Sequence, residues 1–263
     1  MPHSIDREYA ERAIPQYERA VEQARGEPVR IPLDQTAAEV EKIIESCDGV
    51  LLPGSNADVD PSKFRVPRSP HTAVADPGRD SVDQILLQHA YQQRKPILGI
   101  CYGLQSLNVY RSGSLIQHIP DFLPEDVRTK VNHEAGKKIA VAHAVEIESD
   151  SKLAEIVGRR DREGHGLSRA DEESGKSGAL APAGSKLVVP VNSSHHQSAD
   201  VIGGGLRISA RCPDDGIIEA LEGTASDHFV LAVQWHPERS VSEDEPSRAI
   251  FRALIKAAEI RRR

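Results

Sequence analysis

The chain has 263 residues and a net charge of −7, from 33 Lys plus Arg against 40 Asp plus Glu. This acidic balance argues against a protein that wraps DNA or binds an anionic membrane, because such proteins need a cationic surface. No apolar run is long enough to span a bilayer, and the charged N-terminal stretch lacks the apolar core of a secretory signal. We therefore expect a soluble, cytoplasmic protein. Its three cysteines, Cys47, Cys101 and Cys212, are too far apart for a disulfide framework or a zinc knuckle.

Helical and strand-like patterns alternate over the first two thirds of the chain. The predicted helices span residues 7–25, 36–46, 80–94 and 102–113. Thr36 and Glu39 form a capping box at the second helix, and Asp80 or Ser81 is the expected cap of the third. The predicted strands between them span 29–32, 49–53 and 96–100. This alternation is typical of βαβ units and a parallel sheet that is covered by helices on both faces.

After residue 120 the predicted strands come closer together, which suggests antiparallel additions to the sheet. They span 138–148, 187–192, 205–211, 216–222 and 229–235, and Pro246 opens a final helix. The segment 158–186 is rich in charged residues and glycine, so it cannot bury enough apolar surface to offset its ordering entropy. We predict a disordered surface loop there, within one domain of residues 1–263, and deletion of roughly residues 160–183 should change the melting temperature little.

A cysteine stands between a predicted strand and a predicted helix, in the sequence Gly99-Ile-Cys101-Tyr-Gly103-Leu-Gln105. This arrangement is that of a nucleophile elbow with cysteine in place of serine, in which glycines permit the sharp turn. The first N–H groups of the following helix would favour a thiolate and an oxyanion alike. A buried structural cysteine is the alternative, and the elbow by itself does not decide between the two.

A histidine and a glutamate follow the last predicted strand, in the sequence Gln234-Trp-His236-Pro-Glu238. Residues two apart in an extended chain point to the same side, so His236 and Glu238 can share one face. A cysteine nucleophile needs a base, and the base needs a third group that orients its ring. Together with the elbow, these residues predict a catalytic triad of Cys101, His236 and Glu238.

These motifs resemble those of the class I glutamine amidotransferase-like superfamily, whose triad is Cys, His and Glu in that chain order. Further stretches look like the gamma-glutamyl-gamma-aminobutyrate hydrolase family of cysteine peptidases, namely 52–61 (LPGSNADVDP), 76–80 (DPGRD), 113–119 (GSLIQHI), 192–197 (NSSHHQ) and 210–221 (ARCPDDGIIEAL). The resemblance runs from about Tyr17 to the last helix. It implies an α/β fold, with a flavodoxin-like, doubly wound, mostly parallel sheet that has antiparallel strand extensions.

The resemblance also implies an oxyanion hole and a substrate pocket. One donor of the hole would be the backbone N–H of Tyr102, directly after the nucleophile. The other would be the N–H of Ser55, with Gly54 giving the backbone close approach to the substrate. Gln105, on the helix after the nucleophile, matches the substrate-pocket glutamine of the family.

The NSSHHQ motif and Arg79 are further candidates for substrate binding. His196 and Gln197 would lie near the γ-glutamyl group, although two adjacent histidines could instead satisfy backbone groups of the loop. We predict no metal site, because His195 and His196 point in opposite directions in an extended chain and no carboxylate pair accompanies them. Arg79 could bind a substrate carboxylate or form a salt bridge at the start of its helix.

Two features depart from the family pattern. Tyr102 stands where the family commonly has Arg, as in some glutaminase subunits. Members of the family also begin with an apolar strand that lies centrally in the sheet, whereas this chain opens almost directly in the helix that follows it. We therefore expect the first strand to be missing and the sheet to have a gap, and we hypothesise a truncated or mis-started reading frame.

We expect a hydrolase that cleaves the γ-glutamyl amide bond of a small γ-glutamyl amine, such as γ-glutamyl-γ-aminobutyrate from polyamine catabolism, through a glutamyl thioester. No metal or organic cofactor is expected. The expected partner is the small-molecule γ-glutamyl substrate, with a homodimer left open and neither nucleic acid nor membrane bound. Two alternatives remain, a glutaminase component that delivers ammonia to a separate synthase and a catalytically silent γ-glutamyl-binding protein.

Overall fold

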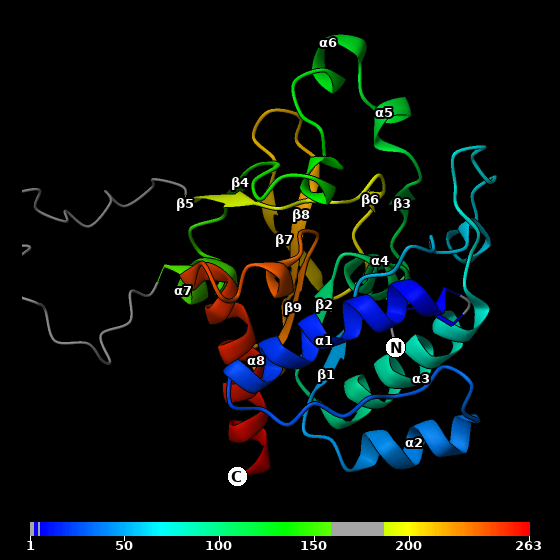
Figure 1. Ribbon diagram of the computed structural model, residues 1–263, viewed down its shortest axis with the longest axis vertical. Helices are drawn as coiled ribbons and strands as arrows, with labels where there is room; N and C mark the ends of the chain where they lie inside the picture. The colour runs from blue at the N-terminus through cyan, green and yellow to red at the C-terminus, as the bar shows by residue number, and fades with distance from the viewer. Residues whose placement is uncertain (1–2, 5, 159–186) are drawn as a thin grey trace, which may run out of the picture.

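The computed structural model describes residues 3–4, 6–158 and 187–263 (Figure 1). The predicted surface loop at 158–186 therefore lies, apart from Gly158, outside the described residues, and so does the proposed deletion within it. Across the described ranges, none of the helices has the length and apolar character needed to cross a membrane.

A seven-stranded sheet forms the centre of the molecule (Figure 1). In the order in which neighbours pair, its strands are β1 (Val50–Leu52), β2 (Ile97–Ile100), β9 (Val230–Val233), β8 (Ile218–Gly223), β7 (Leu206–Arg211), β4 (His143–Ile147) and β5 (Leu187–Val191). The first three are parallel to one another, and all later neighbours are antiparallel. A small second sheet pairs β3 (Leu115–Ile116) with β6 (Ser198–Ala199). The predicted α/β sheet with antiparallel extensions is confirmed.

Helices cover both faces of this sheet. One face carries α1 (Arg7–Gln23), α7 (Lys152–Val157) and α8 (Glu245–Arg262), and the other carries α2 (Ala37–Glu45), α3 (Pro77–Gln93) and α4 (Tyr102–Tyr110). The loops hold the short helices α5 (Ile119–Phe122) and α6 (Glu125–Arg128) and the 3₁₀ turns η1 (Pro61–Phe64), η2 (Ala135–Lys137) and η3 (Pro237–Arg239).

The core follows from the alternation of side chains along the parallel strands. In β2, Leu98 shares a core cluster with Phe251 of α8, whereas its neighbour Ile97 shares the opposite cluster with Leu87 of α3. Both strand residues are completely buried, as the continuous apolar runs of a sheet covered on both faces require. Burial of each such side chain contributes about 1.5–3 kcal/mol, so the centre of the sheet is a rigid support for the loops at its edge.

The predicted strand at 29–32 does not form, and this prediction was wrong. The segment has no regular secondary structure, and it lines a cavity of about 510 Å³ together with β1, the edge strand of the sheet. Within the described residues no strand lies between 29–32 and β1, so the expected first strand is missing, but the seven strands pair without interruption and the expected central gap is not seen. Without a neighbouring strand to pair its backbone, 29–32 remains irregular, and the parallel part of the sheet is smaller than expected.

The third predicted helix begins earlier than expected. Its N-cap is Asp76 rather than Asp80 or Ser81, because the Asp76 carboxylate accepts a 3.0 Å hydrogen bond from the Arg79 N–H and Pro77 occupies the first helical position. Arg79 thus lies in the first turn of α3. The capping box of α2, between Thr36 and Glu39, is confirmed.

Candidate active site

Cys101 occupies the turn between β2 and α4. Its backbone has φ of 53° and ψ of −105°. A positive φ is uncommon for a residue other than glycine, and a residue held in such a sparsely populated region costs on the order of 1–3 kcal/mol. Helix α4 packs directly on β1, since a Cβ atom added at Gly103 would lie 2.2 Å from the carbonyl oxygen of Leu52. The predicted elbow is therefore present, with the cysteine at the N-terminus of α4.

The strand that pairs with β2 carries the second part of the site. His236 follows β9, and Glu238 lies in η3. The distance between His236 Nδ1 and Glu238 Oε1 is 2.7 Å, and each side chain is 3% exposed. Because a carboxylate only accepts hydrogen bonds, Nδ1 carries its hydrogen and Nε2 is the nitrogen that can exchange a proton. The two side chains meet as predicted, although Glu238 lies in a 3₁₀ turn and not in an extended chain.

The turn at Gly54 brings the two parts together. A Cβ atom added at Gly54 would lie 2.9 Å from His236 Cε1 and 3.5 Å from Cys101 Cβ, so only glycine lets the turn contact both side chains. Burial alone would lower the pKa of His236, but the charge of Glu238, and after it that of Cys101, raises this pKa to about 9. The three residues of the predicted triad therefore form one buried cluster, in which the ring is charged at neutral pH.

The two N–H groups that are predicted to form an oxyanion hole lie beside the same turn. The N–H of Tyr102 is the first of α4, and the first N–H groups of a helix have no acceptor within it. The N–H of Gly54 donates a 2.9 Å hydrogen bond to Tyr17 Oη, which fixes the turn against α1. Ser55 Oγ accepts a 3.1 Å hydrogen bond from the Ala57 N–H, while among the described residues nothing accepts one from the N–H of Ser55.

Arg79 is buried behind this turn, with 1% of its surface exposed. Its guanidinium donates hydrogen bonds to Asp83 Oδ1 at 2.6 Å and to the Pro53 carbonyl oxygen at 2.7 Å, and it lies 4.8 Å over the ring of Tyr102. The structure therefore favours the salt-bridge alternative for Arg79. Through Pro53, this side chain positions the turn that begins at Gly54.

Gln105 lies in α4 one turn after Cys101, and its side chain contacts Gln197. The Gln105 amide donates to the Gln197 carbonyl oxygen at 3.2 Å and to Gln234 Oε1 at 3.4 Å. The Gln197 amide donates to the Gln117 carbonyl oxygen at 3.2 Å. Its own Oε1 is buried and has no hydrogen-bond partner in the described part of the chain, so it is available to a polar ligand.

The two adjacent histidines of the NSSHHQ motif point to different surroundings, as predicted. His195 Nδ1 lies 2.8 Å from the Gln197 carbonyl oxygen, so this ring satisfies a backbone group of the loop. The half-buried His196 instead lies 3.1 Å from Asp58 and 3.3 Å from His118. Contact between His196 and a substrate stays a prediction.

Two residues that hold the site were not predicted. Asn192 makes a pair of hydrogen bonds with the backbone of His236, each 2.9 Å long, and thereby fixes the strand end that presents the imidazole. Tyr17 Oη accepts the hydrogen bond from Gly54. The place of Asn192 at the start of NSSHHQ was a usable signal, whereas Tyr17 appears in the sequence only as one apolar position of a helix.

Selective alkylation tests the chemistry of this cluster. Burial raises the pKa of the Cys212 thiol to about 12 and raises that of Cys47 above its usual range, whereas Cys101 lies beside the charged ring of His236. We expect iodoacetamide at neutral pH to label Cys101 first, as mapped by peptide mass spectrometry. The His236→Ala variant should slow labelling of Cys101 and leave that of Cys47 unchanged. Faster labelling of Cys47 or Cys212 in the native protein would contradict this expectation.

Known proteins resemble this chain in sequence and in fold. A family model described as Peptidase C26 matches residues 2–238. The gamma-glutamyl-gamma-aminobutyrate hydrolase PuuD of Escherichia coli K12 is 33% identical over 251 residues, which cover 92% of this chain and 85% of PuuD. A glutamine amidotransferase-like protein of Rickettsia prowazekii is 29% identical over 277 residues, with 92% and 88% covered. The glutaminase domain of Trypanosoma brucei CTPS has a TM-score of 0.53 at 16% identity over 93% of this chain and 87% of that one, which confirms the fold.

Proposed function

Because the chain belongs to the Peptidase C26 family, we propose that it is a thiol-dependent hydrolase of the γ-glutamyl amide bond in small γ-glutamyl amines. The family and the PuuD relative support a hydrolase with a γ-glutamyl hydrolase-like or amidotransferase-like role. The finer proposal rests on one observation, the buried cluster of Cys101, His236 and Glu238 at the N-terminus of α4.

In the first half of the proposed reaction, the sulfur of Cys101 attacks the side-chain carbonyl carbon of the γ-glutamyl group. The proton of the thiol already resides on His236 at neutral pH, and Glu238 stabilises this charged ring at 2.7 Å. The carbonyl oxygen becomes an oxyanion that accepts hydrogen bonds from the N–H groups of Tyr102 and Ser55. When the tetrahedral intermediate collapses, the C–N bond breaks, and His236 gives its proton to the leaving amine. A glutamyl thioester on Cys101 remains.

In the second half, water attacks the thioester carbonyl carbon. His236 takes a proton from this water, and the same two N–H groups hold the oxyanion. Collapse of this intermediate breaks the C–S bond and releases glutamate, while the proton returns to the thiolate of Cys101. In this proposal, the Oε1 of Gln197, which has no hydrogen-bond partner within the described residues, accepts a hydrogen bond from the α-ammonium group of the glutamyl moiety.

A glutaminase that delivers ammonia to a separate synthase is the second candidate function. It is favoured by the glutamine amidotransferase-like relative and uses the same cluster, because glutamine is itself a γ-glutamyl amide. The two functions differ in the leaving group, which is ammonia in one case and a larger amine in the other. Binding energy from a larger leaving amine can be used to raise turnover, so the two can be separated kinetically.

A substrate panel assayed with the purified protein alone tests the proposal. We expect steady glutamate release from γ-glutamyl-γ-aminobutyrate or another γ-glutamyl amine, with glutamine and folate polyglutamate as poor substrates. Cleavage of glutamine alone, and only after a synthase is added, would favour the glutaminase function. Ligand-induced shifts of the melting temperature without any cleavage would identify a binding protein instead.

A further inference from the structure

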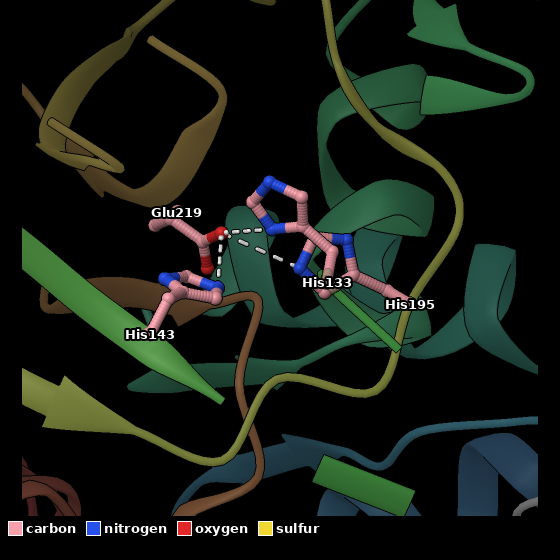
Figure 2. Close-up of side chains that lie close together, drawn as sticks. All are labelled: His133, His143, His195 and Glu219. Carbon is pink, nitrogen blue, oxygen red and sulfur yellow. Dashed lines mark ion pairs between the residues drawn. The ribbon is translucent and has the colours of Figure 1, made fainter. Parts of the chain in front are cut away.

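Four buried side chains outside the cysteine cluster point at one another (Figure 2). They are His133 from the loop between α6 and η2, His143 from β4, His195 from the NSSHHQ loop and Glu219 from β8. Each is at most 9% exposed. One nitrogen of each ring and Glu219 Oε1 all lie within 4.8 Å of one another. Segments far apart in the sequence thus place three imidazoles and one carboxylate around a common point.

The four inward-facing atoms have no hydrogen-bond partner within the described residues, namely His133 Nδ1, His143 Nε2, His195 Nε2 and Glu219 Oε1. Their distances to Glu219 Oε1 are 3.0 Å for His133, 3.3 Å for His143 and 3.4 Å for His195. Buried polar atoms are nearly always hydrogen-bonded, so four such atoms around one point need an explanation.

The other ring nitrogens are held by oxygen atoms that act as acceptors. His133 Nε2 lies 2.7 Å from Asp215 Oδ2, a carboxylate with no exposed side-chain surface. His143 Nδ1 lies 2.9 Å from the Ala144 carbonyl oxygen, and His195 Nδ1 lies 2.8 Å from that of Gln197. Because these oxygens only accept, the outer nitrogens carry the hydrogens. Any inner nitrogen that carries no hydrogen then turns a lone pair toward the Glu219 carboxylate, which is a repulsive arrangement unless a cation lies between them.

We propose that His133, His143, His195 and Glu219 bind a zinc ion. Zinc bonds of about 2.0–2.1 Å in tetrahedral geometry place neighbouring ligand atoms about 3.3 Å apart. This separation agrees with the distances of 3.0–3.4 Å from Glu219 to the three rings. The charges also balance, because one divalent cation neutralises the carboxylates of Glu219 and Asp215 while the rings stay neutral. Hydrogen bonding of each outer ring nitrogen is the arrangement that orients histidine ligands.

This proposal revises the expectation that the chain has no metal site. The reasoning that His195 and His196 cannot both be ligands was correct, because His196 points instead toward Asp58. The other ligands come from residues that are distant in the sequence. A cavity of about 300 Å³ is lined by His133 and His195, so it lies next to these two rings. Four protein ligands complete a tetrahedral shell, so the ion has a structural role and takes no part in the thiol chemistry.

The position of the site suggests what the ion stabilises. It would join the 192–197 loop, through His195, to β8, through Glu219. The Glu219 carbonyl oxygen accepts a 2.8 Å hydrogen bond from the N–H of Gln234, two residues before His236. At the start of the same loop, Asn192 holds the backbone of His236. The bound ion would therefore fix two of the supports of His236, which makes its ligands positioning residues for the active site.

The experiment uses the full chain and metal binding as its readout. We expect about one zinc ion per chain by plasma mass spectrometry after dialysis, a melting temperature that falls by several degrees on removal with a strong chelator, and recovery with ZnCl₂. Cobalt(II) added to the apoprotein should give the visible absorption of a tetrahedral site. The absence of bound metal, together with a melting temperature that neither zinc nor cobalt changes, would overturn the proposal and leave a buried ion-pair network.

Two single variants localise the site. His143→Gln should weaken zinc binding at least about 10-fold, whereas the matched control His196→Gln, which lies outside the four ligands, should bind zinc as the native protein does. Equal zinc affinity in His143→Gln and the native protein would overturn the assignment. If His143→Gln does not fold, the titrations of the native chain still decide. Metal content is measured independently of turnover. The zinc proposal can therefore be refuted while the hydrolase proposal stands, and the hydrolase proposal can be refuted while the zinc proposal stands.

Discussion

The Cys101→Ala variant is expected to lose turnover by a factor on the order of 10⁴ to 10⁶ while remaining folded. The substitution removes the sulfur atom that forms the covalent intermediate. A water molecule would then have to attack the amide directly, and water is a much poorer nucleophile. The structural change is small, because one sulfur atom is deleted at the mouth of a turn whose glycines and hydrogen bonds are untouched. Since about 1 kcal/mol corresponds to 2–4 °C in a chain of this size, the melting temperature should move by only a few degrees.

The matched control for this variant is Cys212→Ala. This cysteine is completely buried in a cluster with Ile116 and Ile217, away from His236. Its replacement should lower the melting temperature, with a far smaller effect on kcat than Cys101→Ala has. Steady-state glutamate release and thermal unfolding, measured on both variants, separate the two effects. Turnover that survives in Cys101→Ala but disappears in Cys212→Ala would exclude Cys101 as the nucleophile.

The Glu238→Gln variant is expected to lower kcat by about 10³- to 10⁴-fold with little change in KM. An amide can present its NH₂ group to His236 Nδ1 and so stabilise the wrong tautomer of the ring, and it cannot stabilise the charged ring. The carboxylate is also the leading cause that raises the pKa of His236. Its removal should lower this pKa, and the alkaline limb of the pH–rate profile should move to lower pH.

The same variant changes how stability depends on pH. In the native protein, the pKa of His236 is about 9, above the value of about 6.5 for an unfolded histidine. The ion pair with Glu238 therefore stabilises the fold fully below pH 6.5, and this contribution is lost as the pH rises toward 9. We expect the free energy of unfolding in urea to fall over this range in the native protein and to fall less in Glu238→Gln. Parallel curves for the two proteins would contradict the assignment of His236 as the group that titrates.

The parts of the site that were predictable lie in short stretches of sequence. Cys101 and its glycines fall within one strand–turn–helix unit, and His236 and Glu238 are two residues apart after one strand. Strand and helix patterns fix the local direction of the chain. Because β2 and β9 are parallel neighbours, the ends of both strands meet at one edge of the sheet. Local chemistry and the direction of the strands were therefore enough to assemble these three residues.

The parts that were missed depend on contacts between distant segments. Arg79 could have met a substrate or a helix partner, and only the packing of α3 against the Pro53 turn decides between them. The zinc ligands come from the 133, 143, 195 and 219 regions, so no spacing in the sequence links them. Segment 29–32 has a strand-like composition, but a strand forms only where a neighbour can pair with its backbone.

The packing of α1 against α8 affects when the protein can become active during its synthesis (Figure 1). Tyr17 of α1 leaves the ribosome early and holds the turn next to Cys101, whereas His236 and the whole of α8 emerge late. At a synthesis rate of about 5–20 residues per second, α1 would be present for many seconds before these partners are synthesised. The parallel part of the sheet also forms late, because β2 pairs with β9, which lies far from it in the sequence. Contacts of such long sequence separation fold slowly, so nascent chains would expose β1, β2 and the apolar face of α1 to chaperones until β9 and α8 have been synthesised.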